Sequence, residues 1–269
     1  MGILLPVLIC FAIAAVCAVI LTIASHFFLI KESEMTLEIR DCLPGANCGA
    51  CGYSGCDGYA KALGEGATDA TNLCIPGGDN CSKQIAAILG VEAGTVVEQV
   101  AYVSCNGRCD MPKKYDYKGI ESCRIANMSY SGDRLCTFAC LGYGDCVNAC
   151  PENAIVIDRG VARVNPKKCI GCGICTRACP NGIIRLVPDT IQVIVECSNH
   201  DKGAQTRKAC MNGCIGCMKC QKTCPEGAIT VVNNLATIDY NKCTGCGACA
   251  DVCPVKCIHT GSFICASSL

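Results

Sequence analysis

The sequence is poor in the large side chains that fill ordinary hydrophobic cores. It has no tryptophan, and aromatic residues make up only 5% of its 269 residues. A chain of this length is expected to form two or three small units, and each would have few large apolar side chains to bury. What the sequence has instead is 31 cysteines. We therefore expect bound metal to replace part of the core, and the metal-free chain to fold poorly beyond its N-terminal segment.

Several other features that would indicate a function are missing. Acidic and basic residues balance at 23 each, and no basic stripe with interleaved aromatics suggests nucleic acid as a partner. There is no phosphate-binding G-x-x-x-x-G-K-[ST] loop. The stretch 245–250 matches a dinucleotide fingerprint, but its cysteines belong to the metal pattern below and no βαβ unit surrounds it. We predict no nucleotide, flavin or substrate-transforming site in this chain.

Charged residues are absent from positions 3–30. This run of about 28 residues exceeds the ~20 that a transmembrane helix needs. A cleaved signal peptide is the alternative, but it would have a basic start and a shorter apolar stretch. We predict a single-pass anchor in residues 1–30 and a linker in residues 31–41. Lys31 and Arg40 follow the apolar run and no basic residue precedes it, which favours the cytoplasmic side of the cell membrane for the remainder.

The last part of the chain, residues 197–269, contains the run C-x2-C-x2-C-x3-C-P twice. This is the spacing of two-cluster ferredoxins. In these proteins the first three cysteines of a run bind one [4Fe-4S] cube and the fourth binds the other. We predict a ferredoxin-like module with two cubes, one bound by Cys214, Cys217, Cys220 and Cys253, and the other by Cys224, Cys243, Cys246 and Cys249.

The same pattern occurs 74 residues earlier, in residues 136–196. This copy predicts a second ferredoxin-like module in tandem with the first. One complete ligand set is present and consists of Cys150, Cys169, Cys172 and Cys175. The offset of 74 also relates Cys123 to Cys197, and Cys136 to Cys210.

The other set of this copy is incomplete. It contains Cys140, Cys146 and Cys179, but Tyr143 stands where the later copy has a cysteine. We expect Cys136, four residues before Cys140, to be the fourth ligand. The alternatives are Cys123 as the fourth ligand, or a three-iron cluster with three ligands.

Residues 42–101 contain a cysteine pattern of another kind, C-x2-C-x4-C-x17-C, in a glycine-rich context. We predict a small N-terminal [4Fe-4S] domain in which the cube is bound by Cys48, Cys51, Cys56 and Cys74. Zinc is a more serious alternative here than for the ferredoxin runs, because structural zinc also uses C-x2-C pairs. Cys42 lies outside the set.

The prediction for the whole chain is five [4Fe-4S] clusters. The connecting segment, residues 102–135, contains Cys105, Cys109 and Cys123, which with Cys81 or another spare thiol could hold a sixth cluster. Spacing alone does not define such a site. It also leaves open the roles of the remaining cysteines, which include Cys197, Cys210, Cys257 and Cys265.

The secondary structure expected around these sites is an α+β arrangement of short elements. Hairpins are predicted for 154–157 with 161–164, and for 228–232 with 235–238. A further strand pair is predicted for 183–187 with 191–195. Apolar residues in 83–101 predict an amphipathic helix that breaks at Gly94.

Two other interpretations of so many cysteines are less favourable. Structural zinc needs two C-x2-C pairs per site rather than interlocked runs of four. Disulfide scaffolds are typical of small secreted chains in an oxidising compartment. This chain is too long and too apolar for such a scaffold.

The order of these motifs resembles a known family. An apolar anchor is followed by N-C-G-A-C-G-Y-S-G-C from Asn47, then C-I-P-G-G from Cys74, C-L-G-Y-G-D-C-V-N-A-C-P from Cys140 and G-C-I-G-C-M-K-C-Q-K-T-C-P from Gly213. This order resembles the B subunit of the Rnf complex, the ion-translocating ferredoxin:NAD oxidoreductase of prokaryotic membranes. The resemblance covers nearly the whole chain, although the simplest members have one ferredoxin module.

The resemblance implies a membrane-anchored electron-transfer subunit of an oxidoreductase complex. Such a subunit accepts electrons from soluble ferredoxin and relays them through its clusters to other membrane, flavin and NAD-binding subunits. The alternative is an iron–sulfur electron-transfer subunit of another membrane redox complex, of the hydrogenase or formate dehydrogenase type.

Overall fold

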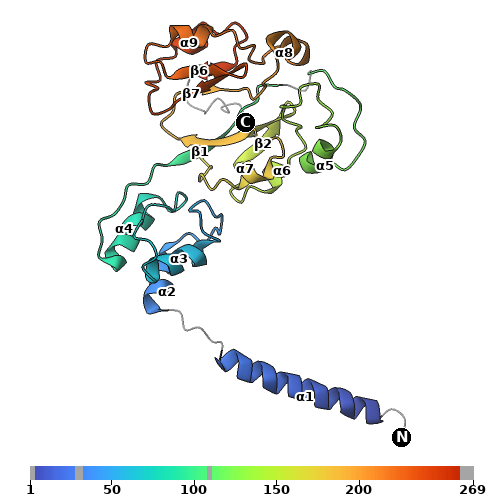
Figure 1. Ribbon diagram of the computed structural model, residues 1–269, viewed down its shortest axis with the longest axis vertical. Coiled ribbons are helices and arrows are strands. Elements are labelled where there is room, and N and C mark those ends of the chain that lie inside the picture. The colour runs from blue at the N-terminus through green and yellow to red at the C-terminus, as the bar shows by residue number, and fades with distance from the viewer. Residues whose placement is uncertain (1–3, 28–32, 108–110, 261–269) are drawn as a thin grey trace.

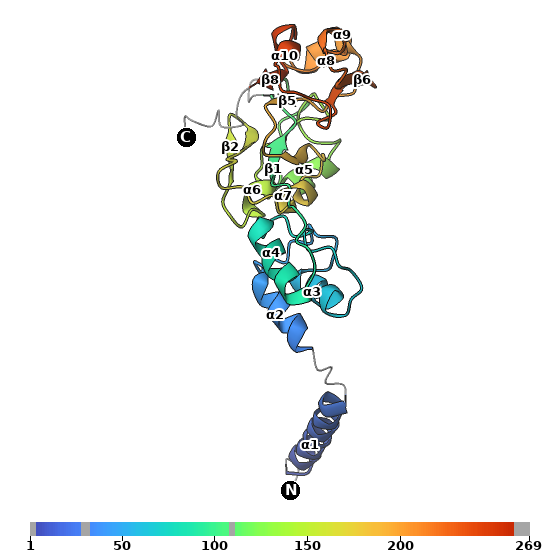
Figure 2. The same ribbon diagram turned by 90° about the vertical axis from the view of Figure 1, so that its left-hand side faces the viewer.

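The computed structural model describes residues 4–27, 33–107 and 111–260. Helix α1 (Leu4–Phe27) lies at one end and projects away from the rest in both views (Figures 1 and 2). Three helices follow, and two modules of short strands and helices lie at the far end. The element order therefore agrees with an anchor, a small N-terminal domain and two mixed α and β units.

Helix α1 is the one described helix that is long and apolar enough to cross a membrane. Its span Val7–Ser25 has no side chain buried against the protein. Phe11 is 75% exposed, which is unfavourable in water but favourable in lipid. The helix thus matches the anchor predicted from the sequence.

The N-terminal domain packs α2 (Glu34–Cys42), α3 (Cys56–Gly64) and α4 (Gly78–Leu89) around a small core. Ser33 caps α2 by accepting a hydrogen bond from the Thr36 amide, which satisfies an otherwise free N–H group. The predicted helix over 83–101 is only partly present. It ends at Gly90 in the left-handed conformation, as helices often do at glycine, and the chain then becomes extended.

Each module contains one local hairpin, as predicted. Strands β2 (Ile155–Asp158) and β3 (Val161–Val164) pair antiparallel in the first module, and β6 (Ile229–Val232) and β7 (Leu235–Ile238) pair in the second. Short helices surround them, and their bounds are α5 (Cys123–Met128), α6 (Asp145–Asn148), α7 (Ile174–Ala178), α8 (Gly203–Ala209), α9 (Lys219–Thr223) and α10 (Ala248–Asp251).

The strand pair predicted for 183–187 with 191–195 is wrong. Strand β4 (Ile184–Pro188) pairs instead with β1 (Gln99–Val103), and β5 (Val193–Val195) pairs with β8 (Ile258–Thr260). Each partner lies more than sixty residues away, so local sequence could not identify it. Strand β1, which crosses the boundary predicted between the N-terminal domain and the connecting segment, therefore completes a sheet of the first module, and β5 completes a sheet of the second.

Strands β1 and β5 occupy equivalent places in the two modules. Val103 lies opposite Ile184 in one sheet and Val195 lies opposite Ile258 in the other. The next residue of each strand donates its amide to the other strand's segment, Ser104 to the Ile183 carbonyl at 2.7 Å and Glu196 to the Cys257 carbonyl at 2.8 Å. The two cysteines that come one residue later, Cys105 and Cys197, are therefore structural counterparts.

The two modules also share buried apolar contacts. Val100 and Tyr102 of β1, Val187 of β4 and Ile194 of β5 form one buried cluster, and Tyr240 of the second module packs against it. Burial of these side chains contributes about 1.5–3 kcal/mol for each large one. The modules are therefore held together by packing as well as by the chain.

One glycine marks the close approach between a cysteine loop and β1. Gly171 has φ +66°, and a Cβ there would lie 2.5 Å from the Gln99 carbonyl oxygen. Gly182 has φ +60° with open space around it. Both positions disfavour a side chain by roughly 1–2 kcal/mol through backbone strain, but only Gly171 adds a steric clash.

We predict that Gly171→Ala lowers the midpoint of thermal unfolding more than Gly182→Ala. The measurement is circular dichroism of the purified chain in detergent, with both variants compared to the unmodified protein. Equal shifts for the two variants would show that the contact with Gln99 does not constrain this loop.

Candidate iron–sulfur centres

The four cysteines of the N-terminal motif line one cavity. Cys48, Cys51, Cys56 and Cys74 surround it together with Pro44 and Pro76. The loop is shaped by Asn47, whose side-chain oxygen accepts a hydrogen bond from the Cys56 amide at 2.8 Å. The structure thus brings together the set that the spacing predicted.

Cys81 lies beside this cavity but is not one of its lining residues. A hydrogen bond from the Cys81 thiol lowers the pKa of Cys74 to about 7, and the same bond raises the pKa of Cys81. Cys81 therefore supports a thiolate at Cys74. Cys42 donates its thiol to the Glu38 carbonyl at the end of α2.

The complete set of the first module also lines one cavity, with Cys150, Cys169, Cys172 and Cys175 around it. Two backbone amides donate to its sulfur atoms. Ala101 donates to Cys169 Sγ at 3.4 Å, and Ala154 donates to Cys150 Sγ at 3.3 Å. Such N–H groups stabilise negative charge on sulfur.

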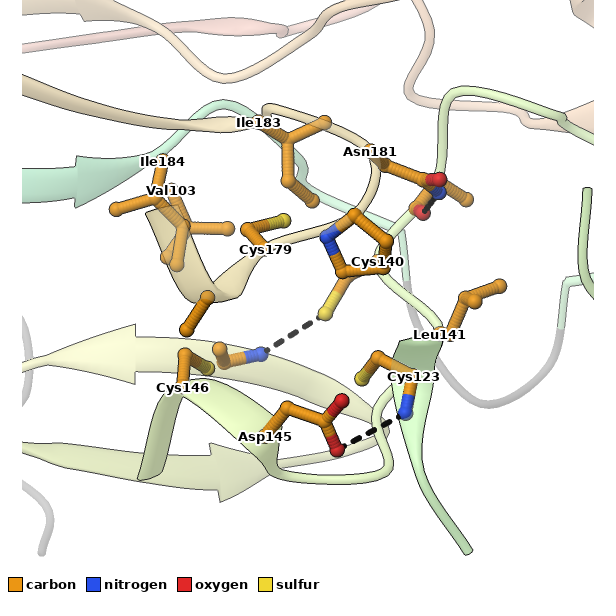
Figure 3. Close-up of a pocket in the computed structure, with 14 residues that line it drawn as sticks. Val103, Cys123, Cys140, Leu141, Asp145, Cys146, Cys179, Asn181, Ile183 and Ile184 are labelled. Carbon is orange, nitrogen blue, oxygen red and sulfur yellow. Dashed lines mark hydrogen bonds between the residues drawn. The ribbon is translucent and has the colours of Figure 1, made fainter. Parts of the chain in front are cut away.

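The incomplete set of this module obtains a fourth thiol from outside the ferredoxin run. Cys140, Cys146 and Cys179 line a cavity of about 340 Å³ together with Cys123. Figure 3 shows the side chains of these four cysteines around the cavity. Ala162 donates its amide to Cys140 Sγ at 3.4 Å, as in the other cavities.

Cys136, which we expected to complete this set, is not at this cavity. It lines a separate cavity with Cys105, Cys197 and Cys210. Tyr143 does not supply a ligand either, since its ring packs on Tyr117 with ring centroids 5.5 Å apart. The alternative with Cys123 is the one that agrees with the geometry.

The position of Cys123 is determined by one carboxylate. Asp145 accepts a hydrogen bond from the Cys123 amide at 3.0 Å (Figure 3). It also accepts hydrogen bonds from the Arg124 amide at 3.0 Å and the Ser122 hydroxyl at 2.9 Å. Asp145 begins α6 and these three donors begin α5, so the carboxylate joins the first turns of both helices. These hydrogen bonds join residues about twenty positions apart in the sequence, so the spacing of the cysteines gave no indication of them.

The second module repeats these arrangements with one difference. Cys214, Cys217, Cys220 and Cys253 line one cavity, but Cys257 is a fifth thiol on its wall. Cys257 lies 3.7 Å from Cys253 Sγ, and its hydrogen bond lowers the pKa of Cys253 to about 5.

The last predicted set, Cys224, Cys243, Cys246 and Cys249, corresponds through the repeat to the complete set of the first module. Its residues belong to adjoining elements. Cys224 follows the last residue of α9, and α9 packs on α10, which contains Cys249. Burial raises the pKa of Cys249, and the nearby Cys243 and Cys246 raise it further. Three of the four thiols are therefore close together.

The electrostatics of these cavities suit iron–sulfur cubes. Burial raises the pKa of Cys146 to about 12 and that of Cys140 to about 11. Neighbouring thiols contribute to both increases, so the thiolates need positive charge between them at neutral pH. A metal cluster supplies that charge.

A single metal ion requires at least three donor side chains to converge closely on one point. Thiolates around one zinc ion lie ~3.8 Å apart, given Zn–S bonds of about 2.3 Å. Within residues 4–27, 33–107 and 111–260, no three His, Cys, Asp or Glu side chains converge closely enough to hold one ion. The cavities therefore fit a cube better than zinc.

The N-terminal domain contacts the first module at its complete site. The guanidinium group of Arg177, on α7, donates to the Cys48 carbonyl. A Cβ at Gly171 would lie 3.0 Å from Ile75 Cγ2, so this loop also touches the N-terminal domain. The N-terminal cavity and the cavity of Cys172 are thus neighbours.

Other cysteines lie outside these cavities. Cys10 and Cys17 lie on α1 and are exposed. Cys109 and Cys265 lie outside the described residues.

Three family models match the chain. The model described as "Putative Fe-S cluster" matches residues 43–76, "4Fe-4S binding domain" matches residues 162–185, and "4Fe-4S dicluster domain" matches residues 213–258. The matched ranges contain the N-terminal motif, the complete run of the first module and both runs of the second. The iron–sulfur character of these segments is thereby confirmed.

The chain is similar to three curated proteins over most of its length. The B subunit of the Na(+)-translocating ferredoxin:NAD(+) oxidoreductase complex of Acetobacterium woodii is 44% identical, over 96% of this chain and 78% of the relative. The B subunit of the proton-translocating complex of Clostridium ljungdahlii is 39% identical, over 84% and 81%. The B subunit of the ion-translocating oxidoreductase complex of Methanosarcina acetivorans is 41% identical, over 83% and 85%.

We predict that Asp145→Ala weakens iron binding in the first module, because Cys123 loses the carboxylate that positions it. Loss of such a helix cap costs about 1–2 kcal/mol. The measurement is the rate at which an iron chelator removes iron from the anaerobically purified protein. Asp158→Ala, at an exposed position on β2, is the control, and identical rates for the two variants would contradict the role given to Asp145.

Proposed function

Because the chain belongs to the family of B subunits of ion-translocating ferredoxin:NAD oxidoreductase complexes, we propose that it accepts electrons from reduced ferredoxin and relays them toward membrane and flavin partners. Within such a complex it is an iron–sulfur electron-transfer subunit. The cavities lined by groups of thiols are what the chain contributes to this chemistry. When bound, [4Fe-4S] clusters supply one-electron transfer. The protein supplies thiolates, amide hydrogen bonds and burial, which determine each potential.

The proposal assigns five cubes to the chain. Four of the ligand sets are those of the sequence prediction, and in the fifth Cys123 takes the place of Cys136. The sets are Cys48, Cys51, Cys56 and Cys74; Cys150, Cys169, Cys172 and Cys175; Cys123, Cys140, Cys146 and Cys179; Cys214, Cys217, Cys220 and Cys253; and Cys224, Cys243, Cys246 and Cys249.

The order of the sites along the molecule is the observation that carries the proposal. The N-terminal site lies on the side of α1, the first module comes next, and the second module is farthest from α1 (Figure 2). The contact of Arg177 with the Cys48 loop joins the first two of these units. Electrons accepted at the second module would therefore move toward the membrane.

Two features of the second module favour it as the place where ferredoxin docks. Cys217 and Cys246 are both exposed, so a donor can approach their clusters closely. Lys219 and Lys222, on α9 beside Cys217, are also exposed. A reduced ferredoxin carries the negative charge of its own cube and its thiolates, and these lysines would attract it.

The orientation in the membrane follows from the same proposal. Ferredoxin is a soluble donor, so we place all cluster domains on the cytoplasmic side with α1 as a single membrane span. The basic residue Arg40, which follows the helix in sequence, agrees with this orientation.

We predict that Lys219→Glu with Lys222→Glu slows reduction of the protein by ferredoxin about tenfold or more at low salt. The measurement is stopped-flow absorbance of the anaerobic protein at several ionic strengths, and the difference should shrink as salt rises. The control is Lys83→Glu with Lys118→Glu, which makes the same charge change at exposed positions elsewhere. Equal rates for the two double variants, with unchanged iron content, would exclude docking at α9.

We predict that an external protease digests the cluster domains in inverted membrane vesicles and leaves them intact in right-side-out spheroplasts. The physical reason is that a single span places everything after α1 on one side. The measurement is immunoblotting of the chain after proteinase K treatment. Digestion in intact spheroplasts would reverse the proposed orientation.

A further inference from the structure

Four cysteines that the five sites do not use surround a cavity of their own. Cys105, Cys136, Cys197 and Cys210 line a space of about 300 Å³, the same volume as the cavities of the N-terminal site and of Cys214. The first three are buried and Cys210 is half-buried. The thiols of Cys105, Cys197 and Cys210 all act electrostatically on Cys136, so each of them lies near it.

This cavity is built from equivalent residues of the two modules. Cys105 and Cys197 each lie two residues beyond the last paired residue of β1 and β5. Cys136 and Cys210 each lie four residues before the first cysteine of a ferredoxin run. The site therefore has approximate twofold symmetry, with two thiols from each module.

The hydrogen bonds around the cavity follow the same symmetry. The Cys140 amide donates to Cys105 Sγ at 3.4 Å, and its counterpart, the Cys214 amide, donates to Cys197 Sγ at 3.2 Å. Asn199 adds its side-chain amide to Cys136 Sγ at 3.4 Å. N–H donors of this kind are found at the other cavities that we assign to cubes, and they stabilise thiolates.

These bonds also connect the cavity to both neighbouring sites. Cys140 is a ligand residue of the first module's cube, and Cys214 is one of the second module's. A group bound at the four thiols would therefore be one peptide amide away from a ligand residue on either side. The cavities of the N-terminal site, the two sites of the first module and the Cys214 site each contain cysteines of one unit only.

We propose that Cys105, Cys136, Cys197 and Cys210 hold a sixth [4Fe-4S] cube, which bridges the two ferredoxin-like modules. Four thiols, a volume of about 300 Å³ where the other sites have about 300–340 Å³, and N–H···S hydrogen bonds support a cube. As elsewhere in the described part of the chain, the thiols do not converge as a single zinc ion would need. The existence of the site does not depend on the proposed function.

The role of the bridging cube does rest on the proposed function. In each step the bridge gains one electron from a reduced cube of the second module, which is oxidised by one electron, and then passes it to the first module. No bond is made or broken and no proton is needed. Without the bridge, electrons would have to cross from Cys214 to Cys140 through protein.

The test compares metal content in the full-length chain, purified anaerobically in detergent. Six cubes correspond to about 24 iron and 24 sulfide per chain. The double variant Cys136→Ala with Cys210→Ala should retain about 20 of each, with one cluster missing from the EPR spectra of the reduced protein. The control, Cys10→Ala with Cys42→Ala, removes two thiols that line none of the cavities described above and should retain all 24.

Unchanged iron and sulfide in the double variant would overturn the proposal, and so would the loss of one zinc ion without loss of sulfide. If the double variant does not accumulate, Cys210→Ser at the half-buried position is measured instead. It should lose one cube or shift the EPR signal of one cube only, and an unchanged spectrum would overturn the proposal.

The same samples separate the two proposals. Mixed with reduced ferredoxin and frozen at intervals, the double variant should show normal reduction of the second module and slower reduction of the first. If neither module of any variant reacts with ferredoxin but one cube is still missing, the function is wrong and the site is right. If both modules react as in the unmodified protein, the bridge has no role in transfer.

Discussion

Bonds between cysteine thiolates and iron are the interaction on which this structure depends. The buried cores of both modules contain cysteines among their main residues, and the remaining apolar side chains are mostly alanine, valine and isoleucine. The sheets have only two strands each, and a two-stranded sheet alone is marginally stable. Because each cube joins cysteines from separate loops, it supplies the long-range connections that a larger hydrophobic core would otherwise provide.

Features encoded locally in the sequence were predicted well, and features that depend on distant partners were not. The ferredoxin runs and the hairpins β2–β3 and β6–β7 are local, and the structure agrees with them. The pairing of β1 with β4 and of β5 with β8 is not local, and it was missed. The choice of Cys136 over Cys123 failed for the same reason. Proximity in sequence favoured Cys136, whereas the carboxylate of Asp145 holds Cys123 at the cavity.

The two copies of the repeat differ at two neighbouring positions of one cysteine loop. Gly144 precedes α6 and has the left-handed conformation, and its counterpart Met218 has the same conformation, with φ 59°. A non-glycine residue in this conformation is strained, yet the loop has the same backbone conformation in both modules. The difference between Tyr143 and Cys217 has a larger effect, because the first module lacks a ligand in its run and uses Cys123 instead. The structural counterparts of β1 and Cys105 are β5 and Cys197. They do not lie 74 residues away, so the constant offset does not identify them.

The pairing of β5 with β8 has a consequence for how the protein is made. Strand β5 begins at Val193 and its partner β8 begins at Ile258, so the ribosome releases β5 long before the sheet can form. Cys197 and Cys257, which adjoin these two strands, are therefore brought together only after β8 has been synthesised. By then α1, which is translated first, is available for insertion into lipid. Iron delivery to the second module is therefore expected to take place at the membrane surface, after β8 has been synthesised.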